Sequence, residues 1–267
     1  MNSNKYVTRM LTMAAIGQAI NAVESIRSID QYRPDAFLRG RAAQSETSQL
    51  LLKFRQLMDT TAGVFAIHAA NVVAPVLVMT GRNSRKRQTA AATISLVANK
   101  LFETRNPYGR DGSDQMQGVI YGYRVATALI PSAERADDLF LRAVNAQLCV
   151  SYSASGLAKL ISSDWRSGRA LELIVRTDIY GGTWFARLVG SRPMIGKILS
   201  WSTIAWESSY PLVYMTNPSA ARGALSMAKA FHLGIAYTMG LPRFFWTFGA
   251  AHPAAEYVID RRALRAF

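Results

Sequence analysis

Lys159 is the residue whose type and position best fit chemistry. It stands near the end of the small, apolar run that enters the stretch SYSASGLAKLISSDWRSGRAL at 151–171, which a DWRSG turn then closes, and no formally charged residue occurs from Ala143 to Ala158. A lysine at the end of a membrane-length apolar helix either extends to the lipid headgroups or faces a polar interior. Burial away from water lowers the pKa of a lysine amine, which can then act as a general base. From position alone, both alternatives remain open.

Two other residues could act together with this lysine. Glu207 is embedded in an apolar run, where a carboxylate is costly unless it is paired or protonated. We expect it to pair with a basic residue, for which the candidates are Lys159, Lys229 and Arg124. His232 lies one helical turn after Lys229 and is either a hydrogen-bonded packing residue or a catalytic one.

The spacing of small and polar residues indicates where Lys159 points. Asn145, Cys149, Tyr152, Gly156 and Lys159 follow one another at helical steps of four, three, four and three, so they share one face. A lipid-facing stripe would instead consist of Leu, Ile and Phe. The pattern therefore predicts that Lys159 points into a helix bundle.

The clearest predicted membrane span is 60–81, which contains no Asp, Glu, Lys or Arg and has the length needed to cross a bilayer. Pro75 predicts a kink in this span. His68 and Asn71 lie one turn apart within it, and we interpret them as making an interhelical hydrogen bond. The next segment, RNSRKR at 82–87, carries four positive charges, which predicts a cytoplasmic loop and a cytoplasmic N-terminus.

Six other apolar runs complete the predicted fold. They lie at 10–23, 89–102, 115–131, 139–161, 194–215 and 224–251. We expect an all-α fold, a polytopic membrane bundle of six or seven transmembrane helices plus interfacial helices, forming one domain over 1–267. Six helices would place the basic C-terminal tail inside and seven would place it outside, and the sequence leaves this open.

Two connecting segments have alternative interpretations. Leu50, Leu51, Phe54 and Leu57 fall at helical spacing, which fits either an amphipathic interfacial helix or a short connector helix. The turn NPYGRDGSDQM at 106–116 could bind a cation through Asp111, Ser113 and Asp114. It lacks the glutamate of a calcium loop, so we expect no metal.

Composition favours a membrane partner. Apolar residues make up 50% of the chain and charged residues 18%, below the roughly 25% of soluble proteins. The net charge of +14 fits nucleic acid or anionic lipid. Basic residues border the apolar runs and do not interleave with aromatics, so we expect the lipid bilayer of the cell membrane and no nucleic acid. Cys149 is the only cysteine, which excludes an intramolecular disulfide.

Several sequence blocks together resemble a known family, the horizontally transferred transmembrane (HTTM) domain family. This domain is related to the membrane portion of vitamin K-dependent gamma-carboxylase. The resemblance covers most of the chain and rests on NPYGRDGSDQM, YSASGLAKLISSDWRSGRAL, ESSYP, AKAFHLGIAYTMGLPRFF and, more weakly, the start from Arg9 to Gly17. The size of the chain is similar to the SdpB-type bacterial branch, which is associated with maturation or export of an antimicrobial peptide.

The resemblance implies roles for individual residues. Lys159 matches the carboxylase lysine that deprotonates a reduced quinone, and Tyr152, Gly156 and Trp165 would border a quinone cavity. His232 resembles a family histidine position. Two departures make glutamate carboxylation doubtful: Ala158 stands where the carboxylase has a second lysine, and the chain has no room for the large extramembrane domain of the carboxylase.

Three functional hypotheses follow. The first is a membrane protein accessory to maturation or export of a small peptide, with a peptide or another membrane protein as partner. The second is a quinone-dependent epoxidase or carboxylase-like enzyme in which Lys159 is the general base and Glu207 and His232 assist. The third is a small-molecule transporter, against which the sequence shows no inverted repeat.

Overall fold

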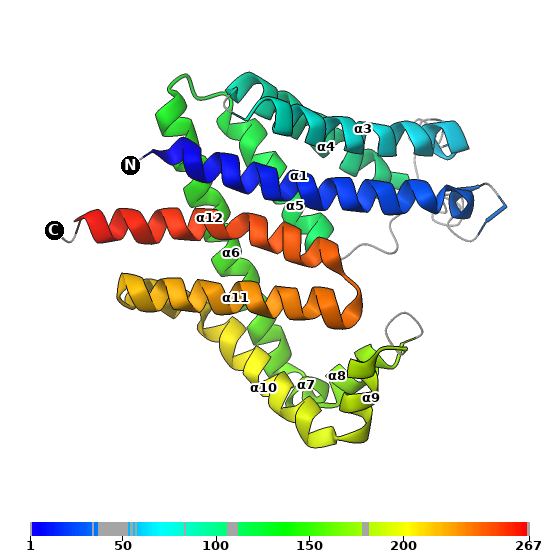
Figure 1. Ribbon diagram of the computed structural model, residues 1–267, viewed down its shortest axis with the longest axis vertical. Helices are drawn as coiled ribbons and strands as arrows, with labels where there is room; N and C mark the ends of the chain where they lie inside the picture. The colour runs from blue at the N-terminus through cyan, green and yellow to red at the C-terminus, as the bar shows by residue number, and fades with distance from the viewer. Residues whose placement is uncertain are drawn as a thin grey trace. The chain divides into compact units, whose positions relative to one another are not determined.

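The protein is built from helices throughout the part of the chain that the computed structural model describes, which is residues 2–33, 35–36, 53, 56, 58–82, 84–105, 112–177 and 182–265 (Figure 1). The all-α prediction is confirmed. The helices, in chain order, are α1 (Ser3–Arg27), η1 (Ile29–Tyr32), α3 (Thr61–Thr80), α4 (Arg85–Arg105), α5 (Gly112–Thr127), α6 (Ala133–Ile161), α7 (Ser163–Ser167), α8 (Arg169–Val175), α9 (Trp184–Ser191), α10 (Pro193–Ser209), η3 (Tyr210–Met215), α11 (Pro218–Met239) and α12 (Pro242–Arg265).

The helices form two compact units. The α1–α5 unit comprises Asn2–Phe140 with Trp246–Pro253, and the α7–α11 unit comprises Leu141–Phe245 with Ala254–Phe267. Helices α6 and α12 each contribute residues to both units. The Lys159 region therefore belongs to the second unit, whereas the predicted span at 60–81 belongs to the first.

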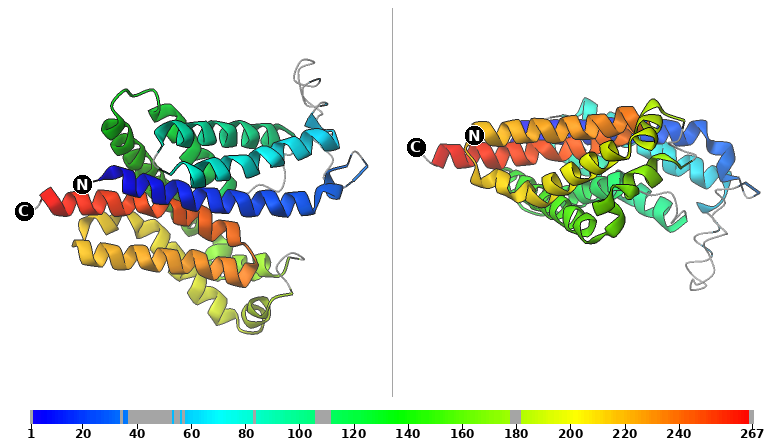
Figure 2. Two further views of the ribbon diagram at one scale, coloured as in Figure 1. Left: turned by 45° about the horizontal axis from the view of Figure 1, so that its top comes forward. Right: turned by 90° about the horizontal axis from the view of Figure 1, so that it is seen from below.

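Within the α1–α5 unit, α1 packs on α3, α3 on α4 and α4 on α5 (Figure 2). Helix α1 begins after Asn2, whose side chain accepts a hydrogen bond from the Asn4 amide at 3.0 Å. Gly17 lets the α12 segment approach closely, because a Cβ there would lie 3.1 Å from the Thr247 hydroxyl oxygen. The absence of a side chain at Gly17 therefore leaves room for the α12 segment.

Helix α3 is the one helix of the described residues that is long and apolar enough to cross a membrane. Its N-terminus is capped by Thr60, whose side chain accepts from the Gly63 amide, and it ends at Gly81. Exposed side chains along it include Phe65, Val73 and Val76. Apolar length alone therefore identifies one possible span, fewer than the six or seven predicted.

In the α7–α11 unit, the short helices α7, α8 and α9 pack against α10. Gly168 joins α7 to α8 in the left-handed conformation, at φ 86°. A Cβ there would lie 2.7 Å from backbone atoms of Lys197, so both conformation and space require glycine. Helix α11 ends at Met239 and is capped by Gly240, and α12 starts at Pro242, so the predicted run at 224–251 is divided between two helices.

Most predicted runs differ from the observed helices at their ends, as α1 (predicted 10–23) and α4 (predicted 89–102) show. Helix α6 starts at Ala133 rather than 139, because Ser132 accepts from the Arg135 amide and Glu134 stands in the first turn. The run at 194–215 changes to a 3₁₀ helix at Tyr210, where Pro211 lacks an amide hydrogen. The basic tail is helical to Arg265. The residues 50, 51, 54 and 57 of the predicted interfacial helix, and Asp111, lie outside the described residues.

Candidate functional site

Lys159 lies within the α7–α11 unit and contacts two acceptors. Its Nζ donates to Glu207 Oε2 at 2.6 Å and to Ser155 Oγ at 2.5 Å. The side chains of Lys159 and Glu207 are 17% and 9% exposed. Nζ also lies 5.1 Å from the centre of the Trp165 ring, a cation–π distance. The amine is therefore held by α6, α7 and α10 and does not extend freely away from the helices.

Tyr152 and His232 form a second polar contact, between α6 and α11. The Tyr152 hydroxyl and His232 Nε2 are 2.8 Å apart, and both residues are buried. The Tyr152 ring stacks on Tyr210 with centroids 4.2 Å apart and meets Trp206 edge-on at 6.4 Å. Tyr152 is thus fixed by an aromatic cluster, in addition to its hydrogen bond with the histidine.

At Gly156, α6 lies close to the backbone of α10. A Cβ at this position would lie 2.4 Å from the backbone nitrogen of Ser208. Earlier on α6, Asn145 accepts a hydrogen bond from the Tyr214 hydroxyl at 2.5 Å. Gly156 therefore acts by steric fit between two backbones.

These contacts bring together the face of α6 that the spacing predicts. Passing from Asn145 to Lys159 along α6, the contacted residues run backwards from Tyr214 to Glu207. The face thus packs antiparallel against the α10–η3 segment. The ESSYP block and the SGLAKL block, which are separate in sequence, form one layer of contacts.

The structure also distinguishes the three candidate partners of Glu207. Lys159 pairs with it, whereas Lys229 pairs with Glu256 at 2.6 Å and Arg124 pairs with Asp137 at 2.8 Å. Each of the three cations therefore has its own carboxylate. The expectation that Glu207 is paired holds, with Lys159 as the partner.

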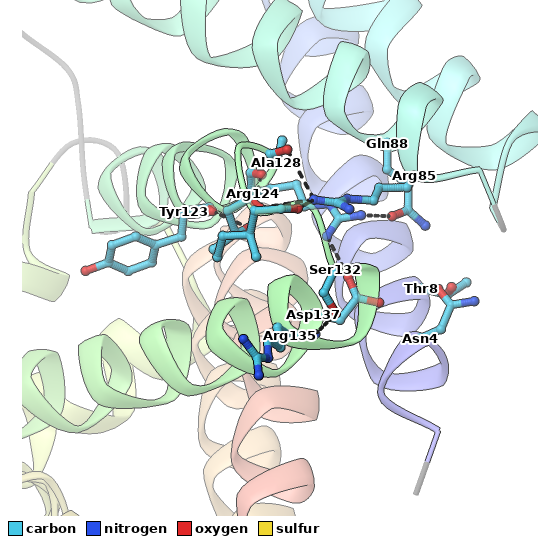
Figure 3. Close-up of polar contacts among 12 residues, drawn as sticks. Asn4, Thr8, Arg85, Gln88, Tyr123, Arg124, Ala128, Ser132, Arg135 and Asp137 are labelled. Carbon is cyan, nitrogen blue, oxygen red and sulfur yellow. Dashed lines mark hydrogen bonds and ion pairs between the residues drawn. The ribbon is translucent and has the colours of Figure 1, made fainter.

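A further charged cluster, in the α1–α5 unit, was not anticipated from sequence (Figure 3). Arg124 is 1% exposed and donates to Asp137 Oδ1 at 2.8 Å and to Gln88 Oε1 at 2.6 Å. Its guanidinium carbon lies 5.6 Å from the centre of the Phe140 ring. A signal was present in the sequence, because an arginine that interrupts an apolar run requires an acid, and Asp137 follows 13 residues later.

Arg85 caps the C-terminal end of α5 in the same region (Figure 3). Its guanidinium donates to the carbonyl oxygens of Thr127, Ala128 and Ile130, at 3.2, 3.1 and 2.6 Å, and more weakly to that of Pro131. These carbonyls lie at or just beyond the last residue of α5, where carbonyls lack the usual helical amide partners and the negative end of the helix dipole attracts a cation. Arg85 therefore has a structural role in addition to its contribution to the positive charge of the turn.

A buried polar network lies at the centre of the α1–α5 unit. The Gln18 side-chain amide donates to Asn71 Oδ1 at 2.7 Å, and its carbonyl accepts from Ser95 at 2.9 Å and from Tyr121 at 2.6 Å. One glutamine of α1 thus contacts α3, α4 and α5. The interhelical hydrogen bond expected for Asn71 is confirmed, and His68 packs against Phe102 with ring centroids 5.0 Å apart.

Within the described residues, no three His, Cys, Asp or Glu side chains are grouped to hold a metal ion. Of the predicted site residues, the structure joins Lys159 to Glu207 and Trp165, and joins Tyr152 to His232. Comparison with models of known protein families, with curated proteins and with solved structures gives no match.

Proposed function

We propose that this chain is a multi-pass membrane protein of the HTTM type that assists maturation or export of a small peptide. Helix length supports the membrane part of the proposal. Six helices of the described chain, α1, α3, α4, α6, α11 and α12, are 20 to 29 residues long, enough to cross a bilayer. Helix α10 with η3 makes a seventh continuous segment, Pro193 to Met215.

Polar groups inside the helices fit this environment. The five long helices other than α3 carry charged side chains, which lower their hydropathy. Many of these groups are paired within the fold, as Gln18, Arg124 and Lys159 are. Paired polar groups are tolerated at membrane depth and help to hold helices together. The positively charged turn after α3 supports a cytoplasmic N-terminus.

The observation that carries the accessory role is the contact between Lys159 and Glu207. A general base needs a lone pair on its nitrogen, whereas the lysine of an ion pair is an ammonium, which has none, and Nζ lies 2.6 Å from Glu207 Oε2. The pair therefore acts as a fixed polar link between α6 and α10. Such a link preserves the shape of a membrane protein that binds a peptide without chemistry at the amine.

A complementation experiment tests this role. A strain that lacks the protein is compared with the wild type by mass spectrometry of secreted peptides, and the missing peptide becomes the readout. We expect Lys159→Arg to restore secretion, because arginine keeps the charge and the pairing with Glu207. Lys159→Ala should reduce it by leaving the carboxylate unpaired. Lys229→Ala, which breaks the similar pair with Glu256, is the matched control and should be milder.

Two results would overturn the proposal. Failure of Lys159→Arg, with normal membrane insertion, would indicate that the amine must release its proton, since an arginine does not. Recovery of the protein in the soluble fraction after lysis without detergent would overturn its membrane character.

The enzyme remains a second candidate because Glu207 lies within proton-transfer distance of Nζ. Passage of a proton from the amine to the carboxylate would leave the amine free to act as a base. Of the predicted quinone-contacting residues, Trp165 is partly exposed beside Nζ, whereas Tyr152 and Gly156 are occupied by packing. A reduced quinone (hydroquinone) would supply the oxidisable group at this edge. Stoichiometric co-purification of a quinone in detergent, lost in Lys159→Ala, would favour this candidate.

A further inference from the structure

The turn that follows α3 concentrates positive charge without a nearby acid in sequence. From Thr60 to Phe102 the chain contains no Asp or Glu, whereas Arg82, Arg85, Lys86 and Arg87 fall within six residues. Because α3 is the helix most able to cross a membrane, this turn stands at the end of a possible span. Charge here would lie at the depth of lipid headgroups.

A hollow of about 470 Å³ opens at this turn. It is lined by Met79, Thr80, Gly81, Arg82, Ser84 and Arg87. The lining thus combines two guanidinium groups and two hydroxyls with one apolar side chain on the α3 side.

The arginine side chains of the turn differ in their hydrogen-bond partners. Arg85 is bound to carbonyl oxygens at the end of α5. The Arg82 side chain is exposed, while its carbonyl oxygen accepts from Gln88 at 2.5 Å and from Thr8 at 3.3 Å. Arg87 makes a long contact of 3.4 Å to the Thr80 carbonyl. Among the described residues, neither Arg82 nor Arg87 pairs with a carboxylate, so both remain able to bind an anion.

We propose that this hollow binds the phosphodiester group of an anionic phospholipid. A guanidinium fork matches two phosphate oxygens, and the Ser84 hydroxyl offers an additional donor, whereas the Thr80 hydroxyl already donates to the Val76 carbonyl at 2.8 Å. Met79 continues the apolar outer surface of α3 and provides a contact for the first acyl carbons. The proposal rests on the proposed membrane function and names the lipid class that this end of α3 recognises.

Native mass spectrometry of the whole protein in detergent tests the site. Dioctanoyl phosphatidylglycerol is titrated against the protein, with dioctanoyl phosphatidylcholine and glycerol 3-phosphate as comparison ligands. We expect phosphatidylglycerol to bind most tightly, and Arg82→Gln to weaken it about tenfold, or about 1.4 kcal/mol. Lys86→Gln removes the same charge from the same turn outside the hollow and should change binding less than twofold.

Three outcomes would contradict either the lipid site or the membrane proposal on which it rests. Equal weakening by Arg82→Gln and Lys86→Gln would overturn the site and leave only general surface charge. Binding of glycerol 3-phosphate as tight as that of the lipid would also overturn it, in favour of a free phosphate site. A thermal melt that matches wild type shows that Arg82→Gln is folded, and Arg87→Gln provides a second variant. A soluble protein after detergent-free lysis would instead overturn the membrane proposal itself.

Discussion

Removing the Arg124 guanidinium should be among the most destabilising single changes in the α1–α5 unit. Arg124 is 1% exposed, and the Asp137 side chain that it contacts is 11% exposed. In Arg124→Met the carboxylate would stay buried without its cation, and Gln88 Oε1 would lose its donor. Breaking one side of a buried ion pair costs about 3–5 kcal/mol, which is the expected loss here.

The double variant Arg124→Met with Asp137→Leu separates pairing from packing. Because both charges are removed together, the only remaining loss of stability comes from the Gln88 oxygen that has no donor, and it should be about 1–3 kcal/mol. Each single change is expected to cost about 3–5 kcal/mol, so the coupling energy should be at least about 3 kcal/mol.

Stability can be measured from the loss of helical circular dichroism during denaturant titration in detergent. Arg222→Met is the control, because its pair with Asp260 has side chains 60% and 24% exposed and should contribute no more than about 1 kcal/mol. The reasoning fails if Arg124→Met is no more harmful than this control. It fails equally if the double variant loses the sum of the two single losses.

Two other substitutions follow from the packing. Gly156→Ala should destabilise the α7–α11 unit by about 1–3 kcal/mol, because the added Cβ would lie 2.4 Å from a backbone nitrogen of α10. The control is Gly122→Ala, at a helical glycine whose added Cβ would have no atom within 4 Å, and this variant should be neutral or stabilising. If both variants lose stability equally, the steric argument is wrong. Gln18→Leu should lower the free energy of unfolding by about 1–3 kcal/mol in the same titration, since three buried side chains lose their hydrogen bond to Gln18. If Asn71→Leu costs as much in the Gln18→Leu background as in the wild type, the hydrogen bonds of the network are not coupled.

The parts of the fold that could be predicted are those set by local pattern. The charge-free run gave helix α3 within one residue at each end, because length, capping and a following glycine all agree. The steps from Asn145 to Lys159 identified a face of α6, because helical periodicity alone determines which residues share a face. The pairing of Glu207 could be predicted because an embedded carboxylate needs a partner.

Features that depend on two helices at once could not be predicted. Arg124 lies on α5 and Asp137 on α6, with a turn between the two helices. Residues 133–138, which precede the predicted run at 139–161, form the first turns of α6. The cluster of positive charges around Arg85 predicted only the side of the membrane on which this turn lies. Its hydrogen bonds could not be predicted, because the carbonyl groups that accept them lie more than 40 residues away in the sequence. The choice among three cations for Glu207 likewise depended on helix rotation, which hydrophobic pattern does not fix.

The side chain of Gln18 has a consequence for how the chain is made. Its partners are synthesised 53, 77 and 103 residues after it, so the amide emerges from the ribosome long before any of them. During that interval water or another polar group must satisfy it, since an unpartnered buried amide is costly. Helix α1 can therefore settle into its final place only after α5 has been completed, which makes its docking a late event in folding.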